Sequence, residues 1–111
     1  MDLDAIQRRL REFAAERDWD QYHSPKNLAM ALAVEAAELM EIFQWVGAEE
    51  SRKAIEHPDK VVQVGDEIAD ICIYAIRLCD IMGVDLDTAI YRKIDQNIEK
   101  YPSDAGRHWS F

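Results

Sequence analysis

Apolar residues recur at the three- and four-residue spacing of an α-helix along most of this chain, and the alternation typical of β-strands is nearly absent. The spacing predicts a first amphipathic helix over residues 3–14. Ser24 and Pro25 then predict a second helix, because serine is a favoured N-cap and proline a favoured first helical residue. We expect this helix to continue to about Val46 and to stop at Gly47.

The middle of the chain predicts a short helix followed by a long one. Residues 48–57 are rich in charge and predict at most a short helix before a His-Pro step. A third long helix is expected from about Asp59 to Met82, because Gly83 is a typical residue just beyond a helix C-terminus.

The last part of the chain predicts one more helix and a short tail. Asp85 is a suitable N-cap, and the helix is expected to end near Tyr101, before a proline. The tail, residues 103–111, shows no clear period. We therefore expect an all-α, four-helix-type fold that forms a single domain over residues 1–111.

The two central helices differ in how much of their surface is apolar. The second helix carries one core stripe: Leu28, Leu32, Leu39, Ile42 and Val46. Residues 68–82 of the third helix are instead apolar nearly all round. A helix that is apolar on every side must be covered on every side, and four helices from one short chain do that poorly. We therefore expect a dimer or a dimer of dimers with this helix at its centre.

Composition and charge exclude several classes of function. The net charge of −9 over 111 residues disfavours binding to nucleic-acid polymers, which requires a basic surface. The chain begins with acidic residues and contains no run of about 18 apolar residues, so we expect neither a signal peptide nor a membrane span. Cys72 and Cys79 lie about 10 Å apart along one helix, too far for a disulfide. They predict reduced, buried core thiols of a cytoplasmic protein.

Two pairs of acidic residues lie inside the most apolar stretches of the sequence. Glu35 and Glu38 belong to the second helix, and Glu67 and Asp70 to the third. Residues three apart share one face of a helix, and Glu35 falls almost at the centre of the apolar stripe. Neither residues 28–46 nor residues 61–76 include a lysine or arginine. A buried carboxylate is costly without a compensating positive charge.

A divalent cation would supply that charge. Two antiparallel helices packed about 8–10 Å apart would bring the pairs together as a four-carboxylate cluster. Ligation by oxygen alone favours Mg²⁺, with Mn²⁺ as a substitute, over Zn²⁺ or Cu²⁺. A di-iron carboxylate bundle is a weaker alternative, because its Glu-x-x-His pairs are missing from both acidic stretches. A solvated, outward-facing arrangement remains the alternative for any one of these acids.

Three further segments accompany the acidic pairs: residues 17–28 (RDWDQYHSPKNL), 41–45 (EIFQW) and 93–102 (KIDQNIEKYP). With them, the sequence resembles the MazG-like nucleoside triphosphate pyrophosphohydrolases, and within that family the dCTP pyrophosphatase subgroup. The resemblance covers about residues 3–102. It implies a Mg²⁺-dependent enzyme that hydrolyses a (deoxy)nucleoside triphosphate, dCTP or a modified dCTP, to the monophosphate and pyrophosphate. Such an enzyme cleanses the nucleotide pool.

The resemblance also implies which residues form the site. The metal ligands would be Glu35, Glu38, Glu67 and Asp70. Either Glu38 or Glu41 would orient the attacking water as a general base. The contacts to nucleobase and sugar would come from Trp19, His23, Asn27, Trp45 and Tyr74. Apart from the resemblance, the helical spacing of Lys93, Asn97 and Lys100 makes a stripe of donors on the last helix, suited to phosphate oxygens and to polar atoms of the sugar or base. Tyr101 follows this stripe as a further candidate contact. Leu10 stands where some members of the subgroup carry a polar residue or histidine, which leaves the preference for cytosine open.

Two other functions remain open at this stage. One is a pyrophosphatase of broader specificity that acts on non-standard nucleotides. The other is a non-catalytic, acidic helical module for metal binding and dimerisation. The release of pyrophosphate from a nucleotide distinguishes the enzymes from the module.

Overall fold

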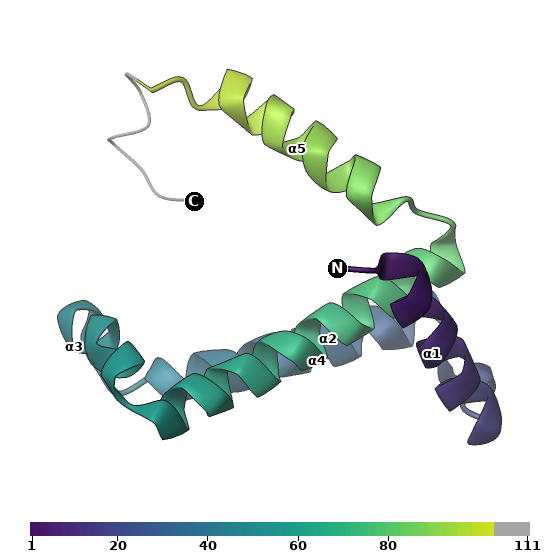
Figure 1. Ribbon diagram of the computed structural model, residues 1–111, viewed down its shortest axis with the longest axis horizontal. Helices are drawn as coiled ribbons and strands as arrows, with labels where there is room; N and C mark the ends of the chain where they lie inside the picture. The colour runs from purple at the N-terminus through teal and green to yellow at the C-terminus, as the bar shows by residue number, and fades with distance from the viewer. Residues whose placement is uncertain (104–111) are drawn as a thin grey trace.

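The computed structural model describes residues 1–103, and every regular element in that part of the chain is helical (Figure 1). The elements are α1 (Leu3–Glu16), η1 (Asp20–Tyr22), α2 (Pro25–Phe43), α3 (Ala48–Arg52), η2 (Lys53–Glu56), α4 (Pro58–Met82) and α5 (Leu86–Lys100). The predicted all-α class is confirmed. Nearly all of the predicted tail lies outside the described residues. No helix in the described part is both long and apolar enough to cross a lipid bilayer.

The helix starts follow the capping signals in the sequence. The Ser24 hydroxyl accepts a hydrogen bond from the backbone N–H of Asn27 at 3.1 Å, and α2 begins directly afterwards. The Asp85 carboxylate accepts one from the N–H of Thr88 at 3.2 Å and starts α5 in the same way. Both predicted starts are confirmed.

The helix ends follow the sequence less closely. Gly83 adopts the left-handed backbone conformation with φ +70° and ends α4, as predicted. The second helix ends at Phe43, three residues before the predicted Val46. The chain then turns directly into α3, so Val46 lies beyond the helix that it was expected to complete.

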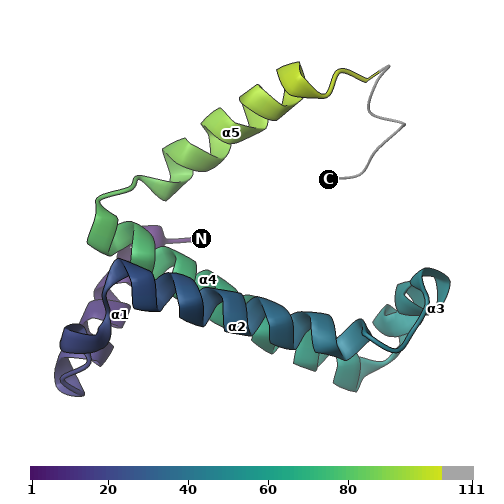
Figure 2. The ribbon, with the colours of Figure 1, turned by 180° about the vertical axis from the view of Figure 1, so that it is seen from behind.

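The centre of the molecule is the antiparallel pair of α2 and α4, which pack side by side along most of their length (Figures 1 and 2). Helix α1 crosses α4 near one end of this pair, and α3 lies at the other end. The apolar side chains that are fully buried among the described residues are Ala14, Leu28 and Ile76, one from each of α1, α2 and α4. The core of a single chain is therefore small and lies where these three helices meet.

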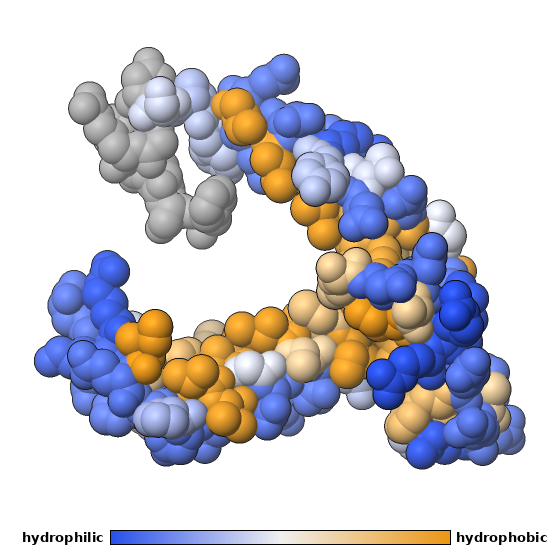
Figure 3. Space-filling view, viewed as in Figure 1, coloured by the Kyte–Doolittle hydropathy of each residue, from blue (hydrophilic) through white to orange (hydrophobic). Residues whose placement is uncertain are grey.

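Helix α5 extends away from the α2–α4 pair and leaves a large apolar surface open (Figures 1 and 3). Its Ile90, Ile94 and Ile98, which we call the α5 stripe, are all exposed. Helix α4 also carries exposed apolar residues along its length: Val61, Val62, Ile68, Ile73, Ile81 and Met82. The radius of gyration is 17.0 Å, whereas a compact domain of this length has about 13 Å. One copy of the chain therefore does not cover its own apolar faces.

This exposure corrects one prediction about the cysteines. Both thiols are free, as expected. Cys79 is half-buried, and burial raises the pKa of its thiol. Cys72 is exposed, so its predicted place in the core is wrong for a single chain. The physical reason is that α1 and α2 cover only part of the circumference of α4.

Candidate metal centre and adjoining cavities

Three of the predicted metal ligands meet across the α2–α4 pair. One carboxylate oxygen each from Glu35, Glu38 and Glu67 lies within 4.8 Å of the other two. We call these three residues the acidic cluster. Glu35 and Glu67 are half-buried, and Glu38 is exposed. The Oε2 atoms of Glu35 and Glu67 are buried and have no hydrogen-bond partner. Oxygens in this position would be costly as bare anions.

The electrostatics of the acidic cluster follow from its crowding. Hydrogen bonding with the Glu38 carboxyl, followed by burial, raises the pKa of Glu35 to about 7. Burial is the main cause that raises the pKa of Glu67, and the like charges of Glu38 and Asp70 add to it. Without a cation, the acidic cluster therefore retains a proton near neutral pH.

These residues fit a hard divalent cation. Every donor is a carboxylate oxygen, the ligand type that Mg²⁺, Mn²⁺ and Ca²⁺ prefer. Oxygens bound to one such ion lie about 2.0–2.6 Å from it, so opposite ligands are separated by up to about 5 Å. The spacing within the acidic cluster is already in this range. A cation would also give the two buried Oε2 atoms the partner that they lack.

The fourth predicted ligand, Asp70, lies one turn farther along α4 and is exposed. It borders a cavity of about 380 Å³ next to the acidic cluster. We call this the aromatic cavity, and its other lining residues are Leu10, Phe13, Trp19, His23, Ile73, Tyr74 and Arg77. Asp70 is thus the carboxylate that connects the acidic cluster with the cavity.

The aromatic cavity brings together Trp19, His23 and Tyr74, three of the residues expected to contact the nucleobase and sugar. The rings of Phe13 and Trp19 meet edge to face, with centroids 5.4 Å apart. Trp19 and His23 belong to the segment between α1 and α2, and Tyr74 belongs to α4. Their common location agrees with the prediction, and their roles remain predictions.

Arg77 is a residue of this cavity that sequence reasoning did not assign to the site. Its side chain is only 10% exposed. The guanidinium donates to Asp20 Oδ1 at 2.8 Å and to His23 Nδ1 at 3.2 Å. The signal for it lies in the helical spacing, since positions 70, 74 and 77 share one face of α4.

On the other side of the acidic cluster is an open depression of about 440 Å³. Glu38 and Glu67 border it together with Glu41, one of the two predicted general bases. Gln63 and Asp66 also line it, and neither was singled out from the sequence. The depression therefore places Glu38 and Glu41 on one polar surface and leaves the choice of base between them open.

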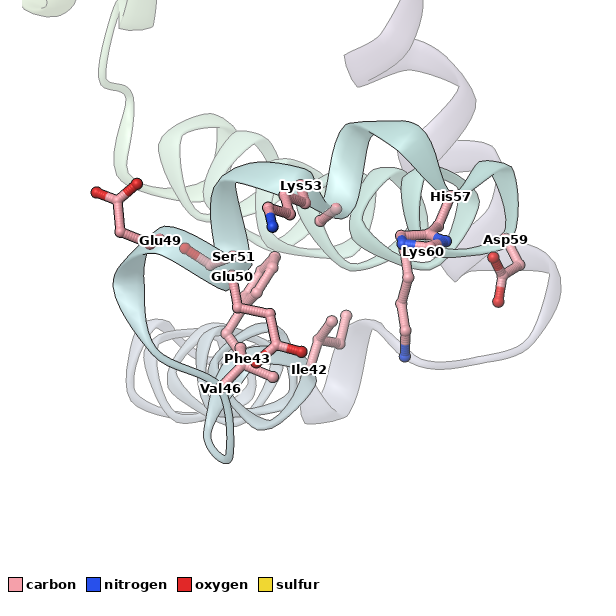
Figure 4. Close-up of a pocket in the computed structure, with 11 residues that line it drawn as sticks. Ile42, Phe43, Val46, Glu49, Glu50, Ser51, Lys53, His57, Asp59 and Lys60 are labelled. Atoms are coloured by element: carbon pink, nitrogen blue, oxygen red, sulfur yellow. The ribbon is translucent and has the colours of Figure 1, made fainter.

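A larger cavity of about 580 Å³ lies at the end of α2 (Figure 4). Ile42 and Phe43 form part of its apolar wall, and the carboxylate of Glu49 points away from it. It is lined by groups of both signs, including Lys53 and Lys60, and Ile42 also borders the open depression. The acidic cluster is not part of its lining, so its size alone does not make it the reactive site.

The structure does not bring two other predicted base contacts into the aromatic cavity. The Asn27 amide donates to the carbonyl of Tyr22 at 2.9 Å and so fastens η1 to the start of α2. Trp45 is 88% exposed and lies just beyond the end of α2, at the opposite end of that helix from Trp19.

The predicted contacts of the last helix are also separate from the acidic cluster. They lie on α5 or directly after it: Lys93, Asn97, Lys100 and Tyr101. Helix α5 extends away from α2 and α4, so the helix that carries these residues is separate from the acidic cluster of its own chain (Figure 2).

Comparisons with known proteins agree with the resemblance found in the sequence. The chain is 40% identical to dCTP pyrophosphatase 1 of Homo sapiens and 42% identical to that of Bos taurus, each over 105 residues. These matches cover 95% of the chain and 62% of each relative, so the chain spans about three fifths of their length. The crystal structure of a pyrophosphatase from Archaeoglobus fulgidus matches with a TM-score of 0.83 at 39% identity, covering 93% of this chain and 94% of that one. Residues 30–110 match the family model described as MazG-like. The chain belongs to the MazG-like family.

Proposed function

We propose that this protein is a Mg²⁺-dependent pyrophosphohydrolase that cleaves a (deoxy)nucleoside triphosphate between its α- and β-phosphates. The products are a nucleoside monophosphate and pyrophosphate, and the preferred substrate is dCTP or a modified dCTP. The observation that carries the proposal is the pair of buried, unpartnered oxygens of Glu35 and Glu67 beside a cavity with aromatic walls. The names of the relatives, dCTP pyrophosphatase 1 and a pyrophosphatase, support the reaction and the substrate.

The acidic cluster would hold the metal ion, with Asp70 as the ligand nearest to the nucleotide. Bound Mg²⁺ neutralises phosphate charge and lowers the pKa of a bound water. The carboxylates that would hold the ion come from α2 and α4, two helices that are packed along most of their length. This rigid support holds the ligands in place while the nucleotide enters from the aromatic cavity.

Glu38 and Glu41 are the groups that would orient the attacking water and accept its proton. They lie three residues apart on α2, and both face the open depression next to the acidic cluster. A carboxylate that also ligates the metal is a weaker base than one that does not, which favours Glu41. Separate Glu→Gln substitutions at the two positions test this choice.

The aromatic cavity would bind the nucleobase. Its volume of about 380 Å³ is enough for a planar ring with part of the sugar, and the faces of Trp19 and Tyr74 are suited to stacking. Asp70 at its border would place the triphosphate toward the acidic cluster. If the triphosphate reaches the acidic cluster from the aromatic cavity, the open depression on the other side of the cluster is left for the attacking water.

We also propose that a second copy of the chain covers the exposed apolar faces, in a homodimer or a homotetramer. The accessible surface is 8868 Å², whereas a compact monomer of this mass exposes about 6,300 Å². The excess is about 2,600 Å² per copy and thus about 5,200 Å² for two copies, close to the upper end of the total area that permanent dimers bury, about 2,000–5,000 Å². In such an assembly, α5 of one copy would carry Lys93, Asn97 and Lys100 to the acidic cluster of another.

The experiment is an assay for pyrophosphate with purified protein, Mg²⁺ and a panel of nucleoside triphosphates. We expect release from dCTP, loss of activity with EDTA, and a decrease of at least about 100-fold in Glu38→Gln and Asp70→Asn. Equal release from non-standard nucleotides would indicate a broader pyrophosphatase. Metal binding without release from any nucleotide would contradict the proposal and favour a non-catalytic module.

A further inference from the structure

Arg77 is a buried cation that donates two hydrogen bonds to the chain segment that forms one wall of the aromatic cavity. Its Nη2 donates to Asp20 and its Nε donates to Nδ1 of His23. Its Nη1 also lies 3.6 Å from Asp80 Oδ2. The proposed metal site does not use this residue, and its position among the apolar side chains of α4 requires another explanation.

The contact between Arg77 and His23 determines where the imidazole carries its proton. A guanidinium only donates, so the Nδ1 atom that receives its hydrogen bond carries no proton. The proton of the neutral ring is then on Nε2. Burial, followed by the charge of Arg77, lowers the pKa of His23 and keeps the ring neutral. Nε2 has no hydrogen-bond partner among residues 1–103 and is left as a donor at the cavity.

We propose that Arg77 is a positioning residue that fixes His23 as an Nε2–H donor and thereby selects the nucleobase. The inference rests on the proposed function, in which the aromatic cavity binds the base. A fixed donor pairs with N3 of cytosine, which is an acceptor, and opposes N3–H of uracil or thymine, which is a donor. Without Arg77, His23 can place its proton on Nδ1 and present Nε2 as an acceptor, which removes the discrimination.

The chain offers a matched control for the loss of an arginine. Arg11 makes two hydrogen bonds to Asp80, at 2.6 and 2.7 Å, and Asp80 in turn lies beside Arg77. Arg11→Met therefore removes a cation from the same group of ion pairs and leaves the bond to His23 intact. Arg77→Met removes that bond.

The first measurement is a ¹⁵N NMR spectrum of the histidine rings in the full chain at pH 7, with His23 assigned by its loss in His23→Gln. We expect the proton of His23 on Nε2 in the unaltered protein and in Arg11→Met. We expect a mixture of tautomers in Arg77→Met. A proton on Nδ1, or on both nitrogens, in the unaltered protein would overturn the proposal without any need for a variant.

The second measurement is the ratio of kcat/KM for dCTP to kcat/KM for dUTP. We expect this ratio to fall by about fivefold to tenfold in Arg77→Met, since one hydrogen bond is worth about that much. It should change by less than about twofold in Arg11→Met. An unchanged ratio in Arg77→Met would overturn the role in selection. If no nucleotide is hydrolysed, the proposed function and the role in selection fail together, while the ring spectrum still decides whether Arg77 fixes His23.

Discussion

A charge placed in the α5 stripe should weaken the association of two copies of the chain. Ile94 lies at the centre of the stripe and is 48% exposed. Full burial of an isoleucine is worth about 1.5–3 kcal/mol, so the exposed half leaves about 0.7–1.5 kcal/mol to be gained per copy. A symmetric dimer gains this twice, about 1.5–3 kcal/mol, which corresponds to about 10- to 150-fold in Kd. Ile94→Glu loses this gain and adds the cost of burying a charge.

The matched control is Gln96→Glu, which introduces the same charge on the same helix about 200° around its axis from Ile94. Sedimentation velocity over a range of protein concentrations measures both dissociation constants. We expect Ile94→Glu to dissociate at concentrations at least about tenfold higher than the unaltered protein, and Gln96→Glu to behave as the unaltered protein does. A monomeric unaltered protein, or equal association of all three proteins, would refute the argument that α5 needs a partner.

Three further predictions concern stability, acidity and metal. Leu28→Ala removes a side chain that is 1% exposed and should lower the free energy of unfolding by about 2.7–5 kcal/mol in urea, whereas Met30→Ala, at an exposed position, should cost much less. The hydrogen bonds from Arg11 lower the pKa of Asp80, so the stability that this carboxylate contributes is present above pH ~4 and is lost as the pH falls through the pKa of Asp80 in the folded protein. In thermal melts at a series of acidic pH values, Asp80→Asn should lose less of its melting temperature on acidification than the unaltered protein. An equal loss in both proteins would contradict the contact. Because the pKa of Glu35 is raised to about 7, protons compete with metal below that pH, so calorimetry should show Mg²⁺ affinity falling by about tenfold per unit below pH 7.

The sequence predicted the helices well because their ends depend on local interactions. Ser24 and Asp85 cap the helices that follow them, and Gly83 adopts the left-handed conformation that ends α4. The meeting of Glu35 with Glu67 was also predictable, since both residues lie within the apolar stretches through which the two long helices pack against each other.

The contact that fixes His23 was not predictable in this way. Arg77 and His23 are 54 positions apart, and no spacing rule connects a helix face with the chain between two other helices. The direction of α5 was also missed, because the short turn after Gly83 fits a helix that folds back or one that extends outward. Cys72 was expected in the core because a helix that is apolar on every side is expected to be buried. The sequence does not say whether the residues that bury it belong to the same chain or to a second copy.

The central claim is that carboxylates from α2 and α4 point toward a shared divalent cation. Calorimetric titration of Mg²⁺ into the unaltered protein and into Glu67→Gln, at pH 8 and without nucleotide, tests it most directly. The account predicts saturable binding to the unaltered protein and an affinity at least about tenfold lower in Glu67→Gln. Equal affinities, or no binding to the unaltered protein, would contradict it.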